Sequence, residues 1–454
     1  MVKYVVQDLS VELHINDKTA NMVHFQLNDT VKFPSKITHH KVDELFLVIA
    51  EDIPTWIILT DNEFKIFTYL QNEKTLEVSL LNSINNDTLS EEKSRDILES
   101  VLQKIEKSKF YFDTKTEIMD NAEDIEKNIH VFITHKCNLQ CPYCYVSAGQ
   151  ELKSELSIDE WKNAFIKLKE VAPKAEITFS GGEPLTKEGI FELFKYTNNL
   201  GFKNLLFTNG LLINKDNIFN IKKYISLVQI SLDGLSPNTH DITRNKGSFK
   251  KTLESIKLII EHKIDLDLAI NITPNNIDEM ETDLINFLEE LSYKQLNIRL
   301  NYHMDREGFA VNLSDNYFTV YQDNREKIKK LIFDLIEKGL YNTSEKEKFK
   351  QLRNCGIGLS FGVNSNGEIY PCDKLYKSYG NIKNDDLNII SEEFSKLNEA
   401  TEIDKMNFCK LCDLRHICNG GCRIDNAIAT GSYIMPLCSE DYKLKLYEKM
   451  IYKF

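Results

Sequence analysis

The 454-residue sequence contains no apolar run approaching ~18 residues, so no segment is long enough to span a membrane as a helix. Its first residues, MVKYVVQDLSVELHIND, lack a basic stretch followed by an apolar one, which excludes a secretory signal. There are no internal repeats and no low-complexity tract. We therefore expect no membrane partner and a cytoplasmic location, where thiols are kept reduced.

Basic residues are also in deficit, because 56 Lys+Arg stand against 69 Asp+Glu and give a formal charge of −13. An acidic chain offers no broad basic face, so we expect no nucleic-acid partner. The hydrophobic and charged fractions, 42% and 28%, are those of an ordinary globular protein. The length allows roughly three domains of about 150 residues each.

The ten cysteines are strongly clustered, and none lies between Cys144 and Cys355. Three fall within eight residues, and the other seven fall in the last hundred. Because a reducing compartment disfavours a disulfide framework, this clustering favours metal or iron–sulfur ligation.

Residues 1–112 have the pattern of a small α+β module. Short apolar stretches at 21–27, 44–50 and 54–60 predict strands, and residues 61–71 and 89–110 carry apolar side chains at helical spacing. The polar stretch 113–127 has almost no apolar period and predicts a linker.

Residues 128–310 alternate strand-like runs with amphipathic segments, which predicts parallel βαβ units. The predicted strands cover residues 130–134, 176–180, 204–209, 227–233, 266–273 and 296–303. Six units are too few for a closed eight-fold barrel, so the predicted fold is α/β, a partial (β/α)6 TIM-like barrel. Chemistry in such sheets gathers at the carboxyl ends of the strands. A helical bridge over 311–350 and a cysteine-rich region over 351–454, closed by a helix from residue 440, complete the chain.

The first cysteine cluster reads Cys137-x3-Cys141-x2-Cys144 and follows the first strand of the predicted barrel. Three thiolates at this spacing can hold three corners of a 4Fe–4S cluster and leave one iron open to a small molecule. Zinc is the alternative, but structural zinc is usually four-coordinate and no fourth ligand sits at a matching spacing. His135 is close in sequence, and packing is the simpler explanation for it.

The turn after the next strand reads Gly181-Gly182-Glu183-Pro184. Together with C-x3-C-x-Φ-C, in which Tyr143 is the aromatic residue Φ, this motif resembles the radical S-adenosylmethionine (SAM) enzymes. The resemblance implies that the open iron chelates the amino and carboxylate groups of SAM, which is cleaved reductively to a 5′-deoxyadenosyl radical. Glycines let a backbone approach a bound SAM closely, and Glu183 can balance the charge of the SAM ammonium group.

Further polar residues match in position those that hold the ribose and carboxylate of SAM in this family. They are Thr208, Asn209, Ser231, Asp233 and Arg244. Arg244 can clamp a carboxylate with two hydrogen bonds. For Thr208, Ser231 and Asp233 the alternative is strand-end capping and turn formation.

The C-terminal cysteines resemble the SPASM domain, an extension of radical SAM enzymes that mature peptides and proteins. By resemblance, one auxiliary 4Fe–4S cluster takes Cys355, Cys372 and Cys422, and the other takes Cys409, Cys412, Cys418 and Cys438. This gives three clusters in all. The family's eighth cysteine is missing here, so the first auxiliary cluster has an open iron or a non-cysteine ligand.

Asp373 follows Cys372 and resembles the proposed base of anaerobic sulfatase-maturating enzymes. An anionic cluster beside it would raise its pKa toward that of a useful base. The alternative is a turn-forming aspartate in the sequence PCDK.

The N-terminal module is similar in element order to the PqqD-like, winged-helix-like element that recognises leader peptides in ribosomal-peptide maturases. Such a domain offers a sheet edge to which a peptide adds as a strand. An unrelated extension packed on the barrel is the alternative.

These resemblances predict an enzyme that modifies a precursor peptide and takes electrons from a flavodoxin or ferredoxin-type reductant. A thioether crosslink of the sactipeptide or ranthipeptide type is expected first, supported by the run N-C-G-x-G at residues 354–358. A carbon–carbon or carbon–oxygen crosslink comes next. A formylglycine-forming sulfatase maturase and a non-enzymatic electron carrier or zinc protein are the alternatives from other classes.

Overall fold

The computed structural model describes residues 10–12, 24–26, 28–72, 75–86, 89–112, 117–118, 128–341, 350–351 and 353–452. The chain forms two compact units. The cysteine unit contains residues 1–120, 344–355 and 402–453, and the barrel unit contains residues 121–343 and 356–401. No helix among these described residues is both long and apolar enough to cross a membrane.

Six parallel strands form the centre of the barrel unit, as the sequence predicts. They are β7 (Asn128–Thr134), β8 (Glu176–Gly181), β9 (Lys203–Thr208), β10 (Leu227–Ser231), β11 (Asp265–Asn271) and β12 (Leu296–Asn301). Each strand pairs with the next in sequence, in the order β12-β11-β10-β9-β8-β7. All their carboxyl ends therefore meet at one rim, and the prediction of a partial barrel is confirmed.

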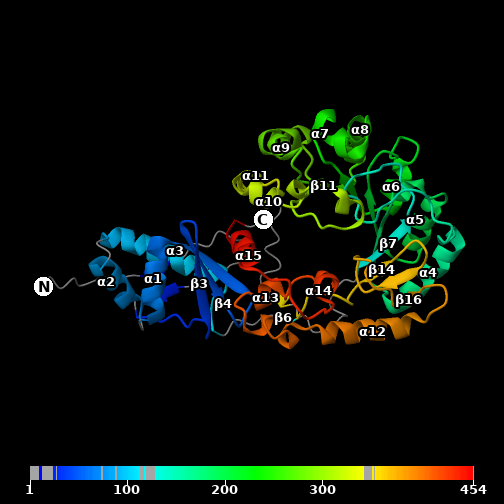
Figure 1. The fold of residues 1–454 in the computed structure, drawn as a ribbon. Coiled ribbons are helices and arrows are strands. Elements are labelled where there is room, and N and C mark those ends of the chain that lie inside the picture. The colour runs from blue at the N-terminus through cyan, green and yellow to red at the C-terminus, as the bar shows by residue number, and fades with distance from the viewer. Residues whose placement is uncertain are drawn as a thin grey trace. The chain divides into compact units, whose positions relative to one another are not determined.

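Helices follow the strands and cover the outer side of the curved sheet (Figure 1). They are α4 (Ile158–Val171), α5 (Ile190–Asn199), α6 (Ile218–Tyr224), α7 (Pro237–Arg244), α8 (Ser248–Glu261) and α9 (Ile277–Leu291). Helix α4 begins with a capping box, because Ser157 accepts from the backbone N–H of Glu160 and Glu160 accepts from that of Ser157. Its buried face carries Trp161 and Phe165.

The two faces of the sheet are buried unequally. On β10, Val228 and Ile230 are fully buried, whereas Gln229 and Ser231 on the opposite face are half-buried. Side chains alternate between faces along a strand, so the helix-covered face is closed and the concave face is not. An incompletely filled concave face is what a partial barrel needs to admit a ligand.

A hairpin from the cysteine-rich region extends this sheet. Strand β14 (Phe361–Val363) pairs in parallel with β7, and β15 (Glu368–Tyr370) and β16 (Gly380–Asn381) follow, giving nine strands. Helix α12 (Leu387–Ala400) comes next. The described part of the bridge before the hairpin contains the helices α10 (Val320–Asp323) and α11 (Arg325–Glu337), separated at Asn324.

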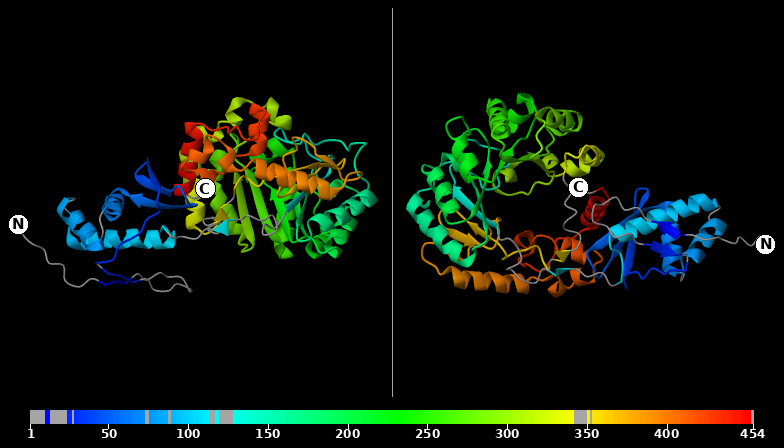
Figure 2. Two further views of the ribbon diagram at one scale, coloured as in Figure 1. Left: turned by 90° about the horizontal axis from the view of Figure 1, so that it is seen from below. Right: turned by 180° about the vertical axis from the view of Figure 1, so that it is seen from behind.

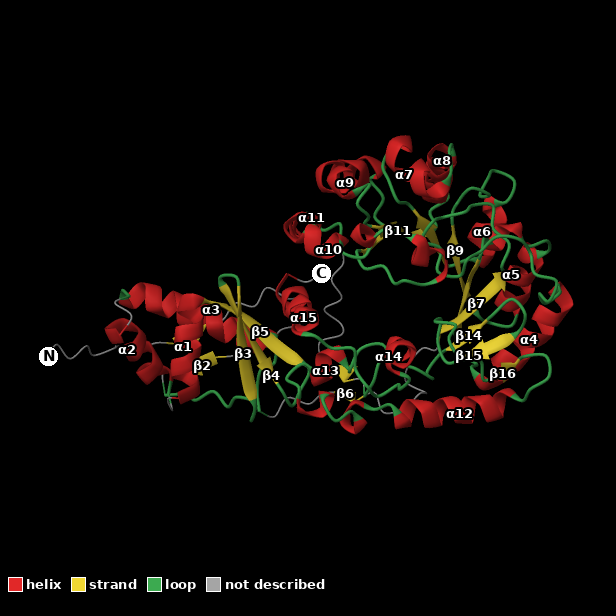
Figure 3. Ribbon diagram, viewed as in Figure 1, coloured by secondary structure: helices red, strands yellow, loops and turns green. Residues whose placement is uncertain are grey.

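The N-terminal part of the cysteine unit is a three-stranded antiparallel sheet with three helices against it (Figure 3). The strands are β3 (Ile37–Val42), β4 (Leu45–Ala50) and β5 (Thr55–Thr60), and the helices are α1 (Asp61–Asn72), α2 (Leu76–Asn86) and α3 (Glu91–Lys107). Ser90 caps α3, because its side chain accepts the backbone N–H of Lys93. Of the predicted strand at 21–27, the described residues include β2 (His24–Gln26), paired with β1 (Ser10–Glu12).

The linker predicted at 113–127 lies outside the described residues except for β6 (Glu117–Ile118), which pairs with β13 (Lys350–Gln351). The end of the bridge, residues 342–349, also lies outside them.

The C-terminal segment of the cysteine unit packs on the other face of that three-stranded sheet. It contains α13 (Arg415–Cys418), α14 (Arg423–Thr430) and α15 (Glu440–Tyr452), and Figure 2 shows α15, in red, beside the blue strands. One buried cluster joins Leu47 and Ile49 of β4 to Leu414, Met450 and Ile451. The sheet is thus buried on both faces, which explains the unbroken apolar run LFLVIA.

Candidate active site

The cysteine loop begins where β7 ends and is closed at its base by backbone hydrogen bonds. The N–H of Cys137 donates to the carbonyl of Gly149 at 2.8 Å, and the N–H of Gly149 donates to that of His135 at 2.9 Å. Within the loop, the N–H of Cys144 donates to the carbonyl of Cys141 at 3.1 Å, forming a tight turn. The three cysteines therefore lie on one short loop at the rim, where the sequence predicts them.

The surroundings of these thiols suit iron–sulfur ligation. Backbone N–H groups of Leu139 and Ala148 lie 3.4 Å from the sulfurs of Cys137 and Cys144, the kind of contact that stabilises a ligating thiolate. All three cysteines are free of disulfides. Burial raises the pKa of Cys137 to about 11, so ligation must release its proton.

The Gly-Gly pair after β8 allows two loops to touch. The N–H of Gly182 donates to the carbonyl of Thr134, and that of Glu183 to the carbonyl of Lys136, both at 2.8 Å. A Cβ on Gly182 would lie 2.2 Å from the Lys136 oxygen, and Gly181 adopts φ +120°. In this structure the glycines are thus needed for the approach of this turn to the cysteine loop.

Glu183 is fully buried, and its carboxylate joins the turn after β8 to the end of β9. Its carboxylate accepts hydrogen bonds from the hydroxyl of Thr208 at 2.8 Å, the N–H of Asn209 at 2.8 Å and the N–H of Leu185 at 3.1 Å. Burial raises the pKa of Glu183, and these hydrogen bonds act against that rise. Pro184 is buried behind it at the start of a short 3-10 turn, Pro184–Thr186.

Asn209 ties the end of β9 to the cysteine loop. Its side-chain amide donates to the side-chain oxygen of Asn138 at 2.7 Å, and Asn138 follows Cys137 directly. Ser231 ends β10 half-buried and makes no side-chain hydrogen bond within the described part of the chain.

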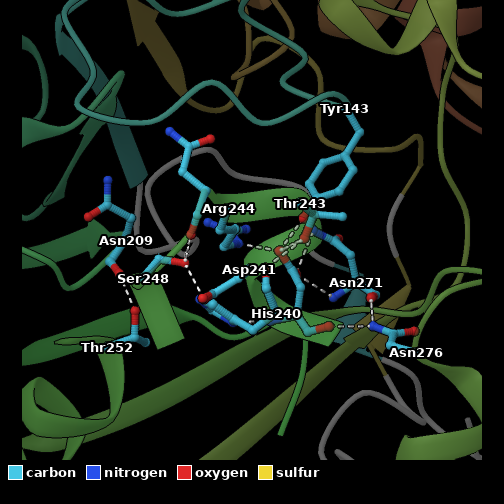
Figure 4. A network of polar contacts seen from close by, with 12 residues as sticks. Tyr143, Asn209, His240, Asp241, Thr243, Arg244, Ser248, Thr252, Asn271 and Asn276 are labelled. Carbon is cyan, nitrogen blue, oxygen red and sulfur yellow. Dashed lines mark hydrogen bonds and ion pairs between the residues drawn. The ribbon is translucent and has the colours of Figure 1, made fainter. Parts of the chain in front are cut away.

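Tyr143, Asp233 and Arg244 meet in a buried polar network at the rim (Figure 4). The Tyr143 hydroxyl and the Arg244 Nε both donate to Oδ2 of Asp233, which is 1% exposed. Although burial alone would raise the pKa of Asp233, the positive charge of Arg244 lowers it overall.

Several residues of this network were not selected from the sequence, among them His240, Asn271 and Asn276. His240 accepts the N–H of Asp233 at Nδ1 (3.2 Å), and Asn271 lies at the end of β11 next to Asp233. Asn276 donates to the carbonyls of Asp233 and Asn271 at 2.8 and 2.7 Å. The position of Asn271 at a strand's carboxyl end is a signal that could have found it.

A cavity of about 240 Å³ opens beside the glycine turn in the barrel unit. It is lined by Phe132, Thr134, His135, Tyr145, Val146, Gly181, Gly182, Glu307, Asn364 and Leu375. The charge of Asp373 opposes the burial-driven lowering of the His130 pKa. Asp373 is also close enough to Tyr145, a half-exposed residue of the cavity wall, to interact with it electrostatically. The predicted base thus lies near a residue that lines the cavity.

Four of the C-terminal cysteines line one pocket of the cysteine unit, with Gly420, Gly421 and Leu414 among its other walls. They are Cys409, Cys412, Cys418 and Cys438, the set predicted for one auxiliary cluster. Four thiols lining one pocket suit a cysteine-ligated iron–sulfur cluster.

Cys355 and Cys422 lie in the same unit, near Arg423. Burial lowers the pKa of Arg423, and the nearby cysteines, Cys355 and Cys422 among them, act against that shift. Cys372, the third predicted ligand of this cluster, follows β15 in the barrel unit.

The fold and site define a class of protein: an open parallel barrel with three clustered thiols at its rim and further cysteine sites outside it. The radical SAM superfamily profile matches residues 131–287, and the profile of SPASM, an iron–sulfur cluster-binding domain, matches residues 355–413. By these two matches the chain carries a radical SAM region and a SPASM region, and it is a radical SAM enzyme whose cofactors are SAM and iron–sulfur clusters.

Two curated relatives illustrate the similarity. The AdoMet-dependent heme synthase of Methanosarcina barkeri is 25% identical over 342 residues, covering 66% of this chain and 92% of the relative. The antilisterial bacteriocin subtilosin biosynthesis protein AlbA of Bacillus subtilis is 27% identical over 326 residues, covering 68% and 69%.

Among solved structures, SuiB of Streptococcus suis bound to S-adenosylmethionine has a TM-score of 0.54 at 16% identity. The match covers 90% of this chain and 99% of SuiB, so the similar fold extends well beyond the barrel.

Proposed function

We propose that this enzyme uses radical SAM chemistry to modify a ribosomally made precursor peptide. The observation that carries the proposal is the cysteine unit, in which a three-stranded sheet with three helices shares a buried core with the cysteine-rich segment. A sheet edge is a surface to which an extended peptide can add as a strand. The similarity to AlbA, whose name places it in bacteriocin biosynthesis, supports the same reading.

In this proposal residues 1–112 recognise the leader of the peptide, residues 128–310 carry out the radical chemistry and residues 351–454 hold the auxiliary clusters. Residues 113–127 are a linker and residues 311–350 a bridge. A flavodoxin or ferredoxin-type protein is the proposed electron donor.

The cysteine loop is proposed to hold one 4Fe–4S cluster through Cys137, Cys141 and Cys144. When bound, this cluster and SAM supply an abstractor of hydrogen atoms from carbon. The glycine turn and the polar side chains of the rim would surround SAM, with the half-buried Ser231 available for a hydrogen bond.

Two auxiliary 4Fe–4S clusters complete the proposal. One takes Cys409, Cys412, Cys418 and Cys438, which already line one pocket. The other takes Cys355, Cys372 and Cys422, which leaves one iron without a cysteine. That iron is the proposed binding position for a sulfur atom of the substrate.

A thioether crosslink is the proposed product. The peptide loses one hydrogen from carbon and one from the cysteine thiol, and a carbon–sulfur bond forms. One hydrogen atom would end in 5′-deoxyadenosine, one proton would pass to a base, for which Asp373 is the candidate, and the remaining electron would be taken up by an auxiliary cluster held by the C-terminal cysteines. A carbon–carbon or carbon–oxygen crosslink has the same balance, whereas a formylglycine-forming activity would instead act on a cysteine or serine side chain.

The test is anaerobic incubation of the reconstituted full-length enzyme with SAM, dithionite and candidate precursor peptides taken from short open reading frames that neighbour its gene. The proposal expects 5′-deoxyadenosine and a peptide lighter by two hydrogen atoms per crosslink, with one fewer alkylatable thiol for each thioether. If the peptide loses the same mass but keeps all its alkylatable thiols, the thioether is rejected and another type of crosslink is retained. Deoxyadenosine without any change in the peptide would overturn peptide modification.

A tetrapyrrole substrate is the second candidate, because the matched heme synthase is aligned over 92% of its own length. That alignment covers 66% of this chain, so the chain carries a further domain-sized portion for which the heme synthase offers no match. Formation of heme from a heme precursor in the same assay would favour this candidate.

A further inference from the structure

We propose that Asp233 is a positioning residue, which holds the cysteine loop in its cluster-binding conformation through the hydroxyl of Tyr143. Arg244 completes this latch, which we define as Tyr143, Asp233 and Arg244. The inference rests on the proposed ligand role of the three loop cysteines, and it gives Asp233 a different task from direct contact with the ribose of SAM.

The carboxylate of Asp233 is already supplied with donors from the protein. Oδ2 accepts from Tyr143 and Arg244, with the Thr243 hydroxyl at 3.5 Å. Oδ1 faces the backbone and side-chain N–H groups of Asn271, both at 3.4 Å. A carboxylate offers about four lone-pair sites, so little acceptor capacity is left for a ribose hydroxyl.

Tyr143 lies between Cys141 and Cys144, so its hydrogen bond to Asp233 restrains the segment that carries two of the proposed cluster ligands. The other end of the loop is held separately, by the Cys137–Gly149 and Gly182–Thr134 backbone hydrogen bonds. Without the Tyr143 hydroxyl, the segment that carries Cys141 and Cys144 loses its side-chain hydrogen bond to Asp233, which lies just after β10 and next to Asn271 at the end of β11.

The charges of the latch are compatible with a neighbouring anionic cluster. An unpaired carboxylate near the loop would repel thiolates. Asp233 is not unpaired, because it forms a buried ion pair with Arg244. The Arg244 Nε is engaged by Asp233, and its terminal nitrogens have no hydrogen-bond partner among the described residues, so Arg244 keeps donors for an anionic ligand.

The decisive variant is Tyr143→Phe, which removes the hydroxyl and keeps the aromatic ring. The matched control is Tyr196→Phe, a half-buried tyrosine of α5 whose hydroxyl makes no hydrogen bond within the described residues. The anaerobic, reconstituted full-length enzymes are reduced, and the electron paramagnetic resonance signal that changes on SAM addition is followed after adding an iron chelator.

The latch predicts that this SAM-responsive signal decays roughly ten-fold faster in Tyr143→Phe than in the wild type, the factor for one hydrogen bond to a charged acceptor. Tyr196→Phe should decay at the wild-type rate. Equal decay in Tyr143→Phe and wild type would overturn the proposal. Melting temperatures of both variants separate local loosening from global unfolding.

Asp233→Asn distinguishes the latch from a SAM contact. As a positioning residue, Asp233 should alter the spectrum of the reduced cluster before SAM is added, as Tyr143→Phe does. A direct contact predicts the opposite: an unchanged SAM-free spectrum with weaker SAM binding by equilibrium dialysis. If the wild-type enzyme gives no SAM-responsive signal at all, the proposed cluster site fails, independently of the latch.

Discussion

Gly182 and Gly149 lie on two segments that meet at the base of the cysteine loop, yet they differ sharply in the space around them. A Cβ on Gly182 would lie within 2.2–2.8 Å of three backbone atoms of Lys136 and His135, which cannot move aside as a flexible side chain would. A Cβ on Gly149 would meet nothing within 4 Å, and its φ is not in the left-handed region.

We therefore expect Gly182→Ala to destabilise the barrel unit by about 1–3 kcal/mol, the cost of overpacking, and to lower the yield of the SAM-responsive cluster. Gly149→Ala should leave both close to wild type. Chemical denaturation and iron analysis measure the two effects. Equal behaviour of the two variants would contradict the steric argument.

His240 makes stability depend on pH. Burial, then the charge of Arg244, lowers the pKa of His240 from 6.5 to about 4. Its Nδ1 accepts the N–H of Asp233, so protonation there would cost that hydrogen bond. Because the folded pKa is depressed, the contribution of neutral His240 is fully present above pH 6.5 and is lost as pH falls toward 4.

As the pH falls from 6.5 to 4, the free energy of unfolding decreases by at most about 3 kcal/mol, which is the free-energy equivalent of the pKa shift of His240. In His240→Gln this contribution is absent, so the stability difference between wild type and variant should shrink from pH 7 to pH 4.5. Denaturation curves at several pH values check this. A pH-independent difference would show that His240 does not stay neutral in the fold.

The sequence predicts which residues lie at the site better than it predicts which of them contact one another. The motif indicates that Glu183 and Asp233 lie at the rim, and the fold brings both there. Their partners are set by distances between segments 25 and 90 residues apart, Glu183 with Thr208 and Tyr143 with Asp233. Spacing along a chain does not encode those distances, so the sequence alone predicted contacts with a ligand.

At the scale of elements, the alternating strands and amphipathic helices were predictable because the spacing of apolar residues changes from a period of 2 in strands to 3.6 in helices. The hairpin β14–β15 was not predicted, since each strand has three residues and lies among cysteines. Its sequence FGV-NSNG-EIY does carry a turn signal between two apolar segments. Sheet extension by this hairpin depends on pairing with β7, which is a tertiary property.

Glu183 links elements, because its carboxylate joins the turn after β8 to the end of β9. In Glu183→Gln, a side-chain NH₂ must face the N–H of Leu185 or Asn209, leaving buried donors unpaired. We expect a loss of about 1–3 kcal/mol in unfolding free energy. Glu188→Gln, an exposed change just beyond the turn, is the control and should have little effect. A Glu183→Gln variant as stable as this control would remove the linking role.

At the scale of the whole molecule, the N-terminal sheet is a structural partner of the cysteine-rich segment. Asp413, next to Cys412, accepts hydrogen bonds from His40 of β3 at 2.6 Å and from Tyr447 of α15 at 3.2 Å. Cys412 and Cys418 themselves pack against the shared apolar cluster. Removing residues 1–112 would expose those shared apolar side chains. A deletion therefore cannot separate the loss of peptide recognition from a failure to assemble the auxiliary iron–sulfur clusters.

Two neighbouring residues of β4 separate these roles, because they face opposite sides of the sheet. Leu47 packs in the cluster shared with the cysteine-rich segment, and Val48 packs against α1–α3; both are 0% exposed. Leu47→Ala should lower the free energy of unfolding by about 2–5 kcal/mol and loosen the packing of the cysteine-rich segment. Cys412 and Cys418 should then be alkylated faster in the iron-depleted full chain. Val48→Ala destabilises the helical side and should leave the alkylation rates of those cysteines, relative to Cys137, near wild type. If both variants accelerate alkylation equally, the two roles are not separable in this way, because the sheet and the cysteine segment then unfold as one cooperative body.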